Sequence, residues 1–206
     1  MSAAAAELAR LHAAPELLIL ANVWDVGSAR AVAGVEGTRA VATASHAIAA
    51  AHGYPDGEQI PLELHLAAIE RIVRAVELPV TADLEAGYGD PGETARRAIA
   101  LGVAGMNLED ERKPLGEAVA AVEAVVAARE AEGTGLVLNA RTDAYLLGAP
   151  DPLAEALERG RAFLEAGAEC VFVPGVRDAA TVEALVAGLG RGRLSVLAGP
   201  GAPPTA

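Results

Sequence analysis

Acidic or amide side chains occur at alternate positions in two short segments of this sequence. Asp83 and Glu85 are two residues apart in TADLE, and Asn107 and Glu109 are two residues apart in NLE. Residues two apart in a β-strand point to the same face of a sheet, so both segments would present oxygen atoms on one face. Buried carboxylates gathered in this way repel one another unless a cation lies among them. Oxygen ligands without nearby His or Cys suit Mg²⁺ or Mn²⁺, so we predict a divalent metal bound by Asp83, Glu85 and Glu109.

A third segment, NARTDAY, repeats this spacing with Asn139, Arg141 and Asp143. A guanidinium group binds a carboxylate or a phosphate through two parallel hydrogen bonds. We therefore expect Arg141 to hold the anionic group of a ligand that the metal also binds. The alternative role for Arg141 is that of a salt-bridge partner that neutralises the acidic cluster.

The segment ATASHAIAAAHGYPDG adds further polar groups. It offers Ser45 directly after an apolar run, and Asp56 on a loop bracketed by Gly and Pro. Loops that follow strands carry binding and catalytic residues more often than they carry stability. His46 lies next to Ser45 and is the preferred candidate for a proton donor, with His52 as the second candidate.

The elements that must position these residues alternate between strand and helix. Seven short β-branched runs predict strands, and they span residues 17–23, 40–45, 79–85, 105–110, 135–142, 170–176 and 194–200. Helical patterns lie between them, near residues 28–34, 61–75, 92–101, 115–132, 151–165 and 178–188. Consecutive strands joined through helices form a parallel sheet, which indicates an α/β fold.

Two architectures contain such a sheet. A doubly wound sheet places a GxGxxG turn after its first strand, and ANVWDVGSAR lacks that spacing. A (β/α)8 TIM-type barrel instead distributes polar residues over the C-terminal ends of many strands, which is the pattern here. We expect one barrel domain over residues 1–206, with an N-terminal helix at about 3–13. Because GPGAPPTA follows the seventh run directly, the eighth βα unit is expected to be absent from this chain.

Composition limits the partners. The chain has 206 residues and a formal net charge of −12, so nucleic acid and anionic membrane surfaces are not expected to bind. No run of about 18 apolar residues predicts a membrane span, and the N-terminal segment resembles an amphipathic helix more than a signal peptide. The single cysteine, Cys170, excludes an intramolecular disulfide and is expected to pack inside a strand. These features predict a cytoplasmic protein.

Five ordered motifs resemble the isocitrate lyase and phosphoenolpyruvate mutase (phosphonomutase) superfamily. They are NVWDVGSAR, HGYPDG, TADLEAGYG, NLED and NARTDAYL, and the resemblance extends over about residues 17–200. It implies a (β/α) barrel that exchanges its eighth helix with a partner subunit, which gives homodimers or homotetramers. It also implies a metal site at Asp83, Glu85 and Glu109, with some ligands acting through water.

The same resemblance implies the substrate class. It assigns Asp56 as an active-site residue, Ser45 as a substrate-seating residue and Arg141 as a substrate-binding residue, and it adds Trp24 and Asn139 to the substrate contacts. The implied substrate is a small anionic 2-oxo acid, a phosphonate or a phosphoenolpyruvate-like molecule. Its C–C or P–C bond would break or rearrange through an enolate stabilised by Mg²⁺ or Mn²⁺.

One loop departs from the family pattern. Isocitrate and methylisocitrate lyases carry a catalytic cysteine in a KxCGH-type loop, but EDERKPLGEAV at residues 109–119 contains neither Cys nor His. Those two activities are therefore not expected. The asparagine-bearing gating loop of phosphonomutases is also missing here. Decarboxylation or hydrolytic cleavage of an oxaloacetate-like substrate remains, alongside a phosphonomutase with an unrecognised lid.

Two other hypotheses use different features. A phosphate-binding barrel would use the glycine amides of LAGPGAP at residues 197–203, and phosphate would then bind in the presence of a chelator. A catalytically impaired barrel would act as a binding module, and it would bind magnesium without consuming any 2-oxo acid.

Overall fold

A parallel sheet of seven strands organises the chain, whose computed structural model describes residues 2–199. The strands pair in sequential order from β1 to β7, and every pairing is parallel. Their bounds are β1 Ala21–Val23, β2 Val41–Thr43, β3 Val80–Asp83, β4 Gly105–Glu109, β5 Val137–Arg141, β6 Cys170–Phe172 and β7 Leu194–Ser195. All seven predicted runs therefore contain strands, each of them shorter than predicted.

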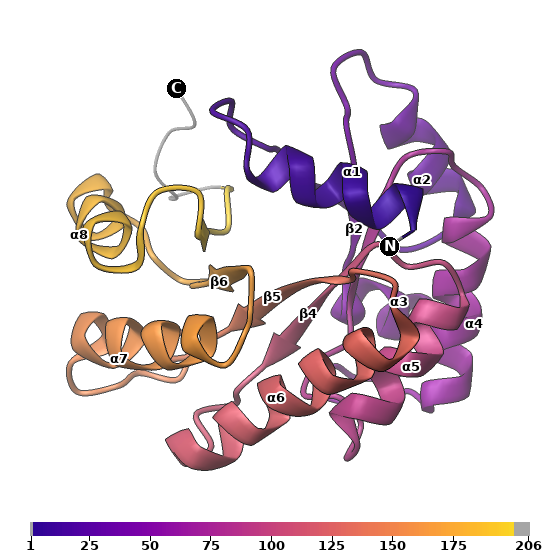
Figure 1. Cartoon of the computed structure of the whole chain (residues 1–206). Helices are drawn as coiled ribbons and strands as arrows, with labels where there is room; N and C mark the ends of the chain where they lie inside the picture. The colour runs from indigo at the N-terminus through magenta and orange to yellow at the C-terminus, as the bar shows by residue number, and fades with distance from the viewer. Residues whose placement is uncertain (1, 200–206) are drawn as a thin grey trace.

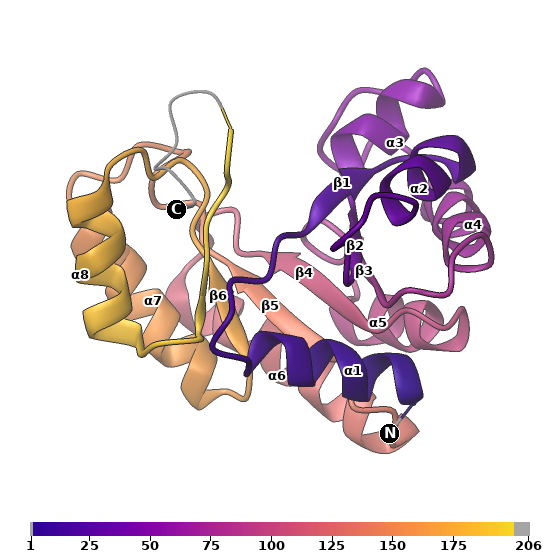
Figure 2. The same cartoon turned by 90° about the horizontal axis from the view of Figure 1, so that it is seen from above.

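The helices lie on the outside of the curled sheet (Figures 1 and 2). Their bounds are α1 Ala3–His12, α2 Val26–Ala33, α3 Ser45–Ala51, α4 Leu62–Val73, α5 Pro91–Ala100, α6 Leu115–Glu132, α7 Pro152–Glu165 and α8 Ala179–Leu189. Aspartates cap four of them: the side chains of Asp25, Asp90, Asp151 and Asp178 each accept a backbone N–H of the first turn. Proline begins α5 and α7, where a missing N–H costs no helical hydrogen bond.

Helix α1 covers the N-terminal ends of the central strands. Leu8 and Leu11 of α1 pack in one apolar cluster with Ala104 and Val137, which lie where β4 and β5 begin. A side chain at Gly105 would place its Cβ 2.7 Å from Leu8 Cδ2 and 2.9 Å from the Val137 carbonyl oxygen, so this close approach requires glycine. With one end covered by α1, the C-terminal ends of the strands are the end left for a site.

The sheet curls into a half-barrel. Within residues 2–199 no pairing joins β1 to β7, so these strands form its two edges. Two expectations from the sequence stay predictions: that the chain lacks an eighth βα unit, and that residues 1–206 form a single domain. The last predicted strand extended to Pro200, and most of the LAGPGAP segment, like residues 200–206 generally, lies outside the described residues.

Helix α3 differs from the sequence prediction, which placed no helix between residues 34 and 61. Ser45–Ala51 forms a helix instead, and Ile48 and Ala49 of this helix are buried in the main core. Four alanines and one isoleucine in seven residues give it an apolar face. No helix among residues 2–199 is long and apolar enough to cross a membrane.

Candidate functional site

Strand register brings three polar side chains to one level of the sheet. Asp83 of β3 is the Cα partner of Asn107 of β4, which is in turn the partner of Asn139 of β5. Glu109 and Arg141 are partners two residues further along. The Nδ2 atom of Asn139 donates to Asn107 Oδ1 at 2.9 Å, as the side-by-side placement requires.

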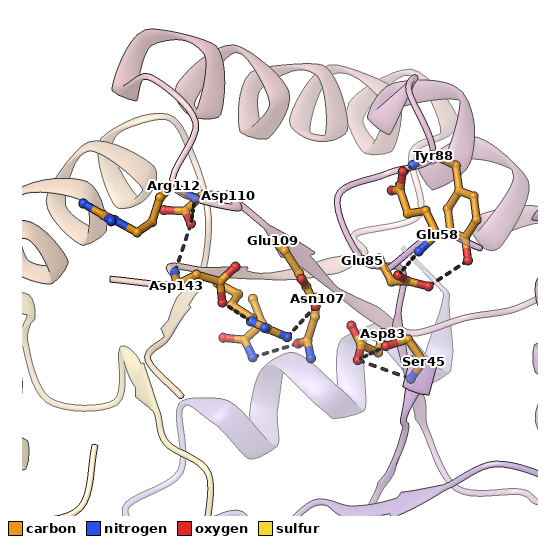
Figure 3. Close-up of polar contacts among 12 residues, drawn as sticks. Ser45, Glu58, Asp83, Glu85, Tyr88, Asn107, Glu109, Asp110, Arg112 and Asp143 are labelled. Atoms are coloured by element: carbon orange, nitrogen blue, oxygen red, sulfur yellow. Dashed lines mark hydrogen bonds and ion pairs between the residues drawn. The ribbon is translucent and has the colours of Figure 1, made fainter. Parts of the chain in front are cut away.

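The residues between these positions face the core. Ala82, Met106, Leu108 and Ala140 are all at most 3% exposed and belong to the main apolar cluster. The predicted alternation in β4 and β5 is therefore confirmed, and the polar groups lie together at the C-terminal ends of the strands (Figure 3).

Asp83 is held by the segment that follows β2. Its Oδ2 accepts the hydroxyl of Ser45 at 2.9 Å and the Ser45 backbone N–H at 3.3 Å, while its own N–H donates to Thr43 Oγ1 at 3.0 Å. Its Oδ1 is buried and has no hydrogen-bond partner among the described residues. Burial raises the pKa of Asp83 above its ordinary value, although Ser45 and Arg141 act in the opposite direction. An ionised carboxylate with one orphaned buried oxygen is a group that a cation would stabilise.

Arg141 links two acidic groups. Its Nη1 is paired with Glu109 and its Nε donates to Asp143 Oδ1 at 2.7 Å. The guanidinium carbon lies 6.0 Å from the centroid of the Phe172 ring. Burial nevertheless raises the pKa of Glu109 to about 8. The charge of Arg141 lowers this pKa, and the charges of Asp83 and Asp143 raise it. One arginine thus does not neutralise the negative charge at this end of the sheet.

The prediction that the alternation of β3 continues from Asp83 to Glu85 is wrong. The strand ends at Asp83, and Glu85 has a left-handed backbone with φ of 53°. The carboxylate of Glu85 accepts the backbone N–H of Glu58 and, at 2.9 Å, the hydroxyl of Tyr88. Its backbone carbonyl still accepts the N–H of Glu109 at 2.8 Å, which keeps the turn attached to β4.

The acidic residues do not form a ready-made direct coordination sphere. In residues 2–199 no three His, Cys, Asp or Glu side chains are grouped closely enough to hold one ion together. Burial raises the pKa of Asp83, Glu85 and Glu109 alike, and the charges of neighbouring carboxylates raise those of Glu85 and Glu109 further. These residues fit an ion that binds one carboxylate directly and the others through water.

The remaining predicted residues lie around this cluster with fewer contacts. Asp56 is exposed on the loop of residues 52–61, and its charge contributes to raising the pKa of Glu85. His46 is exposed on α3, and its ring makes no hydrogen bond to another described residue. Trp24 is 43% exposed, and its backbone N–H donates to Ser28 Oγ at 3.0 Å. The Oδ1 atom of Asn139 is buried and has no partner in the described part of the chain.

A buried ion-pair network supports the loops that follow β4 and β5. Asp110 accepts the backbone N–H groups of Arg112 and Asp143 at 2.9 Å each, and its Oδ2 accepts Arg159 Nη1 at 3.1 Å. Glu155 of α7 pairs with both Arg112 and Arg159. The β4–α6 loop is short, since α6 begins at Leu115. The pair between Arg112 and Glu155 ties this loop to α7.

Replacing Asp110 by alanine is expected to destabilise the fold by about 3 kcal/mol, because Arg159 would remain buried without this carboxylate. The side chains of Asp110 and Arg159 are only 2% and 10% exposed. The urea unfolding midpoint would measure the loss. Glu7→Ala serves as the control, since it breaks an exposed pair with Arg10 and should leave the midpoint unchanged. An unchanged midpoint for Asp110→Ala would contradict the structural role of this network.

Cys170 packs inside a strand, as predicted, and is the Cα partner of Asn139 on the neighbouring strand. It is 1% exposed in β6, and its Sγ lies 3.3 Å from Ser195 Oγ. Burial raises the pKa of its thiol to about 11. A buried, protonated thiol is a packing group and not a nucleophile or an acid–base group.

Sequence prediction missed Glu58 and Tyr88, which the structure brings to this site, and it assigned no role to Asn107 and Asp143. Asn107 had a signal, because it shares the spacing of Glu109, but no role was assigned to it. Tyr88 and Glu58 bind Glu85 or its neighbours, and Asp143 orients Arg141. No local pattern identifies such partners, since Glu58 and Tyr88 are 30 residues apart in the sequence.

Comparisons with known proteins agree on one family. The family model described as phosphoenolpyruvate phosphomutase matches residues 8–206. A crystal structure of a Burkholderia cenocepacia J2315 protein, provisionally described as a phosphonomutase, is 42% identical with a TM-score of 0.89, and the match covers 95% of this chain and 84% of that one. A crystal structure of 2,3-dimethylmalate lyase, described as a PEP mutase/isocitrate lyase superfamily member, is 29% identical with a TM-score of 0.85, covering 95% and 71%.

A curated relative extends the range of reactions. An oxaloacetate decarboxylase of Ectopseudomonas mendocina is 32% identical over 188 residues, covering 82% of this chain and 61% of the relative. More generally, the chain spans between 57% and 65% of the length of the first curated relatives that it matches over most of its own length.

Proposed function

Because this chain belongs to the phosphoenolpyruvate phosphomutase family, within the PEP mutase/isocitrate lyase superfamily, we propose that it is a magnesium-dependent enzyme that decarboxylates an oxaloacetate-like 2-oxo acid. The observation that carries the proposal is the orphaned, buried Oδ1 of Asp83 at the strand ends that also present Glu109 and Arg141. The resemblance predicted from the motifs is confirmed at the level of the family. The reaction and the metal are our proposal.

We assign direct metal binding to Asp83 and water-mediated binding to Glu85 and Glu109. Support for this division comes from hydrogen bonding: Asp83 Oδ1 has no partner among the described residues, whereas both carboxylate oxygens of Glu85 already accept hydrogen bonds. Mg²⁺, or Mn²⁺ in its place, would supply positive charge for the carbonyl oxygen on which negative charge develops as the C–C bond breaks.

Arg141 is proposed to bind a substrate carboxylate. Its Nε and Nη1 are held by Asp143 and Glu109, so the guanidinium plane is fixed. Nη2 makes no hydrogen bond to any residue in the described ranges and keeps its protons for a ligand. A fixed guanidinium loses little entropy when it binds a carboxylate, which favours this role.

Ser45 and Asn139 are proposed to seat the substrate beside Asp83. The hydroxyl and N–H of Ser45 position the Asp83 carboxylate, and the free Oδ1 of Asn139 offers a buried acceptor at the same level, to which the enol hydroxyl of the substrate or a bridging water would donate. Trp24, Asp56 and His46 complete the proposed contacts from the surrounding loops. His46 would deliver the proton that converts the product enolate to pyruvate, so that oxaloacetate and one proton give pyruvate and carbon dioxide.

The β4–α6 loop argues against isocitrate and methylisocitrate cleavage. Its five residues, 110–114, contain no Cys or His and are tied to α7 by the Arg112–Glu155 pair. Cys170 is too deeply buried in β6 to substitute. Decarboxylation needs fewer acid–base residues, because the leaving carbon dioxide does not have to be protonated.

A phosphonomutase is the second candidate, since a protein described in that way is 42% identical to this chain. The charge balance favours the first candidate. A phosphonate adds negative charge to a site where Asp83, Glu85 and Glu109 already have raised pKa values and one arginine is shared between two carboxylates. A smaller and less charged 2-oxo acid fits that balance better.

A substrate panel tests the proposal. The protein with Mg²⁺ is incubated with oxaloacetate, phosphonopyruvate, phosphoenolpyruvate or methylisocitrate, and pyruvate, phosphate and succinate are measured. Pyruvate release from oxaloacetate must exceed the spontaneous rate with Mg²⁺ alone and must stop with EDTA. Interconversion of phosphonopyruvate and phosphoenolpyruvate would establish the second candidate, and turnover of none of the four would refute the proposal.

We also propose that the enzyme works as a homodimer or homotetramer. The two sheet edges are unpaired within residues 2–199, and exposed apolar side chains lie near them at Leu17, Ile19 and Leu197. Unpaired edges of this kind are normally covered. Analytical ultracentrifugation tests this, and a monomer with full activity would contradict it.

A further inference from the structure

Four side chains next to the proposed metal site form a connected hydrogen-bonded cluster, which we name the loop clamp. Its members are Glu85 after β3, Tyr88 in the turn before α5, Glu58 in the loop of residues 52–61 and His65 on α4. The proposed mechanism uses only Glu85, through water. Figure 3 shows Glu58, Glu85 and Tyr88 facing one another beside the strand ends.

The loop clamp joins two segments by reciprocal bonds. The Glu85 carboxylate accepts the backbone N–H of Glu58, and the Glu58 carboxylate accepts the backbone N–H of Tyr88 at 2.6 Å. The Tyr88 hydroxyl then donates to Glu85 Oε1 at 2.9 Å. Two of these bonds fasten the loop of residues 52–61 to the turn that follows β3, and the third holds Tyr88 against Glu85 within that turn. All three are bonds to charged groups, which are the stronger kind.

Backbone geometry shows that the clamp holds both segments in an unfavourable conformation. Glu58, Glu85 and Tyr88 have φ of 57°, 53° and 53°, in the left-handed region that side chains rarely adopt. Such residues persist where surrounding contacts over-determine them. Each of the three belongs to the clamp, so loss of one clamp bond should release the loop locally and leave the fold intact.

His65 orients the tyrosine. Its ring is fully buried, and its Nδ1 lies 2.8 Å from the Tyr88 hydroxyl. Because that hydroxyl donates to Glu85, its oxygen accepts a hydrogen bond from the Nδ1–H of a neutral His65 ring. Burial lowers the pKa of His65 to about 4, which agrees with a neutral ring, and Nε2 has no partner in the described part of the chain.

We propose that Glu58, Tyr88 and His65 are positioning residues that hold the loop of residues 52–61, and with it Asp56, against the strand ends. Asp56 lies two residues before Glu58, so the placement of Asp56 follows that of the clamped backbone. The consequence for catalysis rests on the proposed function, in which Asp56 contacts the substrate. A loosened loop then weakens substrate binding and leaves bond cleavage unchanged once the substrate is bound.

Amide hydrogen exchange of the free protein tests the clamp without any substrate. Tyr88→Phe and Glu58→Ala are expected to speed exchange in the peptide covering residues 53–60 by about tenfold, the value of one hydrogen bond to a charged group. Glu58→Gln keeps an acceptor for the Tyr88 N–H and should retain most of the protection. Tyr54→Phe is the matched control, because Tyr54 lies in the same loop and its hydroxyl has no hydrogen bond within residues 2–199. Helix α6 should exchange equally slowly in all variants, which reports an intact fold.

Steady-state kinetics on oxaloacetate tests the predicted effect of the clamp on substrate binding. Tyr88→Phe is expected to raise KM by about tenfold with kcat within about twofold of the wild type, a split that general destabilisation would not give. Unchanged exchange in both Tyr88→Phe and Glu58→Ala overturns the proposal, as does faster exchange with an unchanged KM. Faster exchange in a protein that does not consume oxaloacetate would support the clamp and refute the proposed function.

Discussion

Replacing Asp83 by asparagine is expected to lower kcat/KM for oxaloacetate by about a thousandfold or more. The amide keeps an oxygen for the two Ser45 bonds but removes the negative charge on which direct metal binding depends. Loss of a buried, uncompensated charge should leave the protein folded and raise its melting temperature slightly. The rate of pyruvate release with saturating Mg²⁺ is the measurement.

Asp178→Asn is the matched control for this substitution. Asp178 caps α8, where its side chain accepts the N–H of Thr181, and asparagine caps helices equally well. Its kcat/KM should equal that of the wild type. Full turnover in Asp83→Asn would remove Asp83 from the reaction and with it the proposed metal ligand.

Replacing Arg141 by lysine is expected to raise KM for oxaloacetate by about a hundredfold. An ammonium group keeps the charge, but it cannot bind Glu109, Asp143 and a substrate carboxylate in one plane as the guanidinium does. Steady-state kinetics would show the effect mainly in KM, because the lost bonds hold the substrate in the ground state as well as in the transition state.

Arg129→Lys controls for loss of a buried guanidinium. Arg129 is 15% exposed, close to the 19% of Arg141, and pairs with Glu169 near the opposite end of the sheet. The Arg129→Lys variant should have a lower free energy of unfolding and an unchanged KM for oxaloacetate. Equal KM values for Arg141→Lys and the wild type would show that Arg141 serves only to neutralise its acidic neighbours.

The sequence predicted the sheet because its signals were regular. In β4 and β5, strict alternation puts Met106, Leu108 and Ala140 in the core and therefore directs Glu109 and Arg141 to the other face. Parallel register then brings those residues together without any further information. The alternating order of strands and helices likewise determined a parallel sheet, and the family was identified from motifs at its C-terminal ends.

Prediction failed where backbone conformation departs from a regular element. Nothing in TADLE indicates that the strand stops at Asp83 or that Glu85 adopts φ of 53°, since glutamate is not a residue typical of that region. The loop clamp was missed for a related reason. His65 occupies a buried position of an amphipathic helix, and its bond to Tyr88 joins residues 23 apart in the sequence. Such contacts depend on tertiary structure that no local pattern encodes.

Direct measurement of divalent-metal binding tests the central claim most closely. Titration of the purified protein with Mn²⁺, followed by the loss of the free-ion electron paramagnetic resonance signal, should show one ion bound per chain and competition by Mg²⁺. Asp83→Asn should lose this binding, while Asp178→Asn should keep it. Binding of the ion to Asp83→Asn with wild-type affinity, or no binding to the wild type even with a 2-oxo acid present, would contradict a metal held at the ends of these strands.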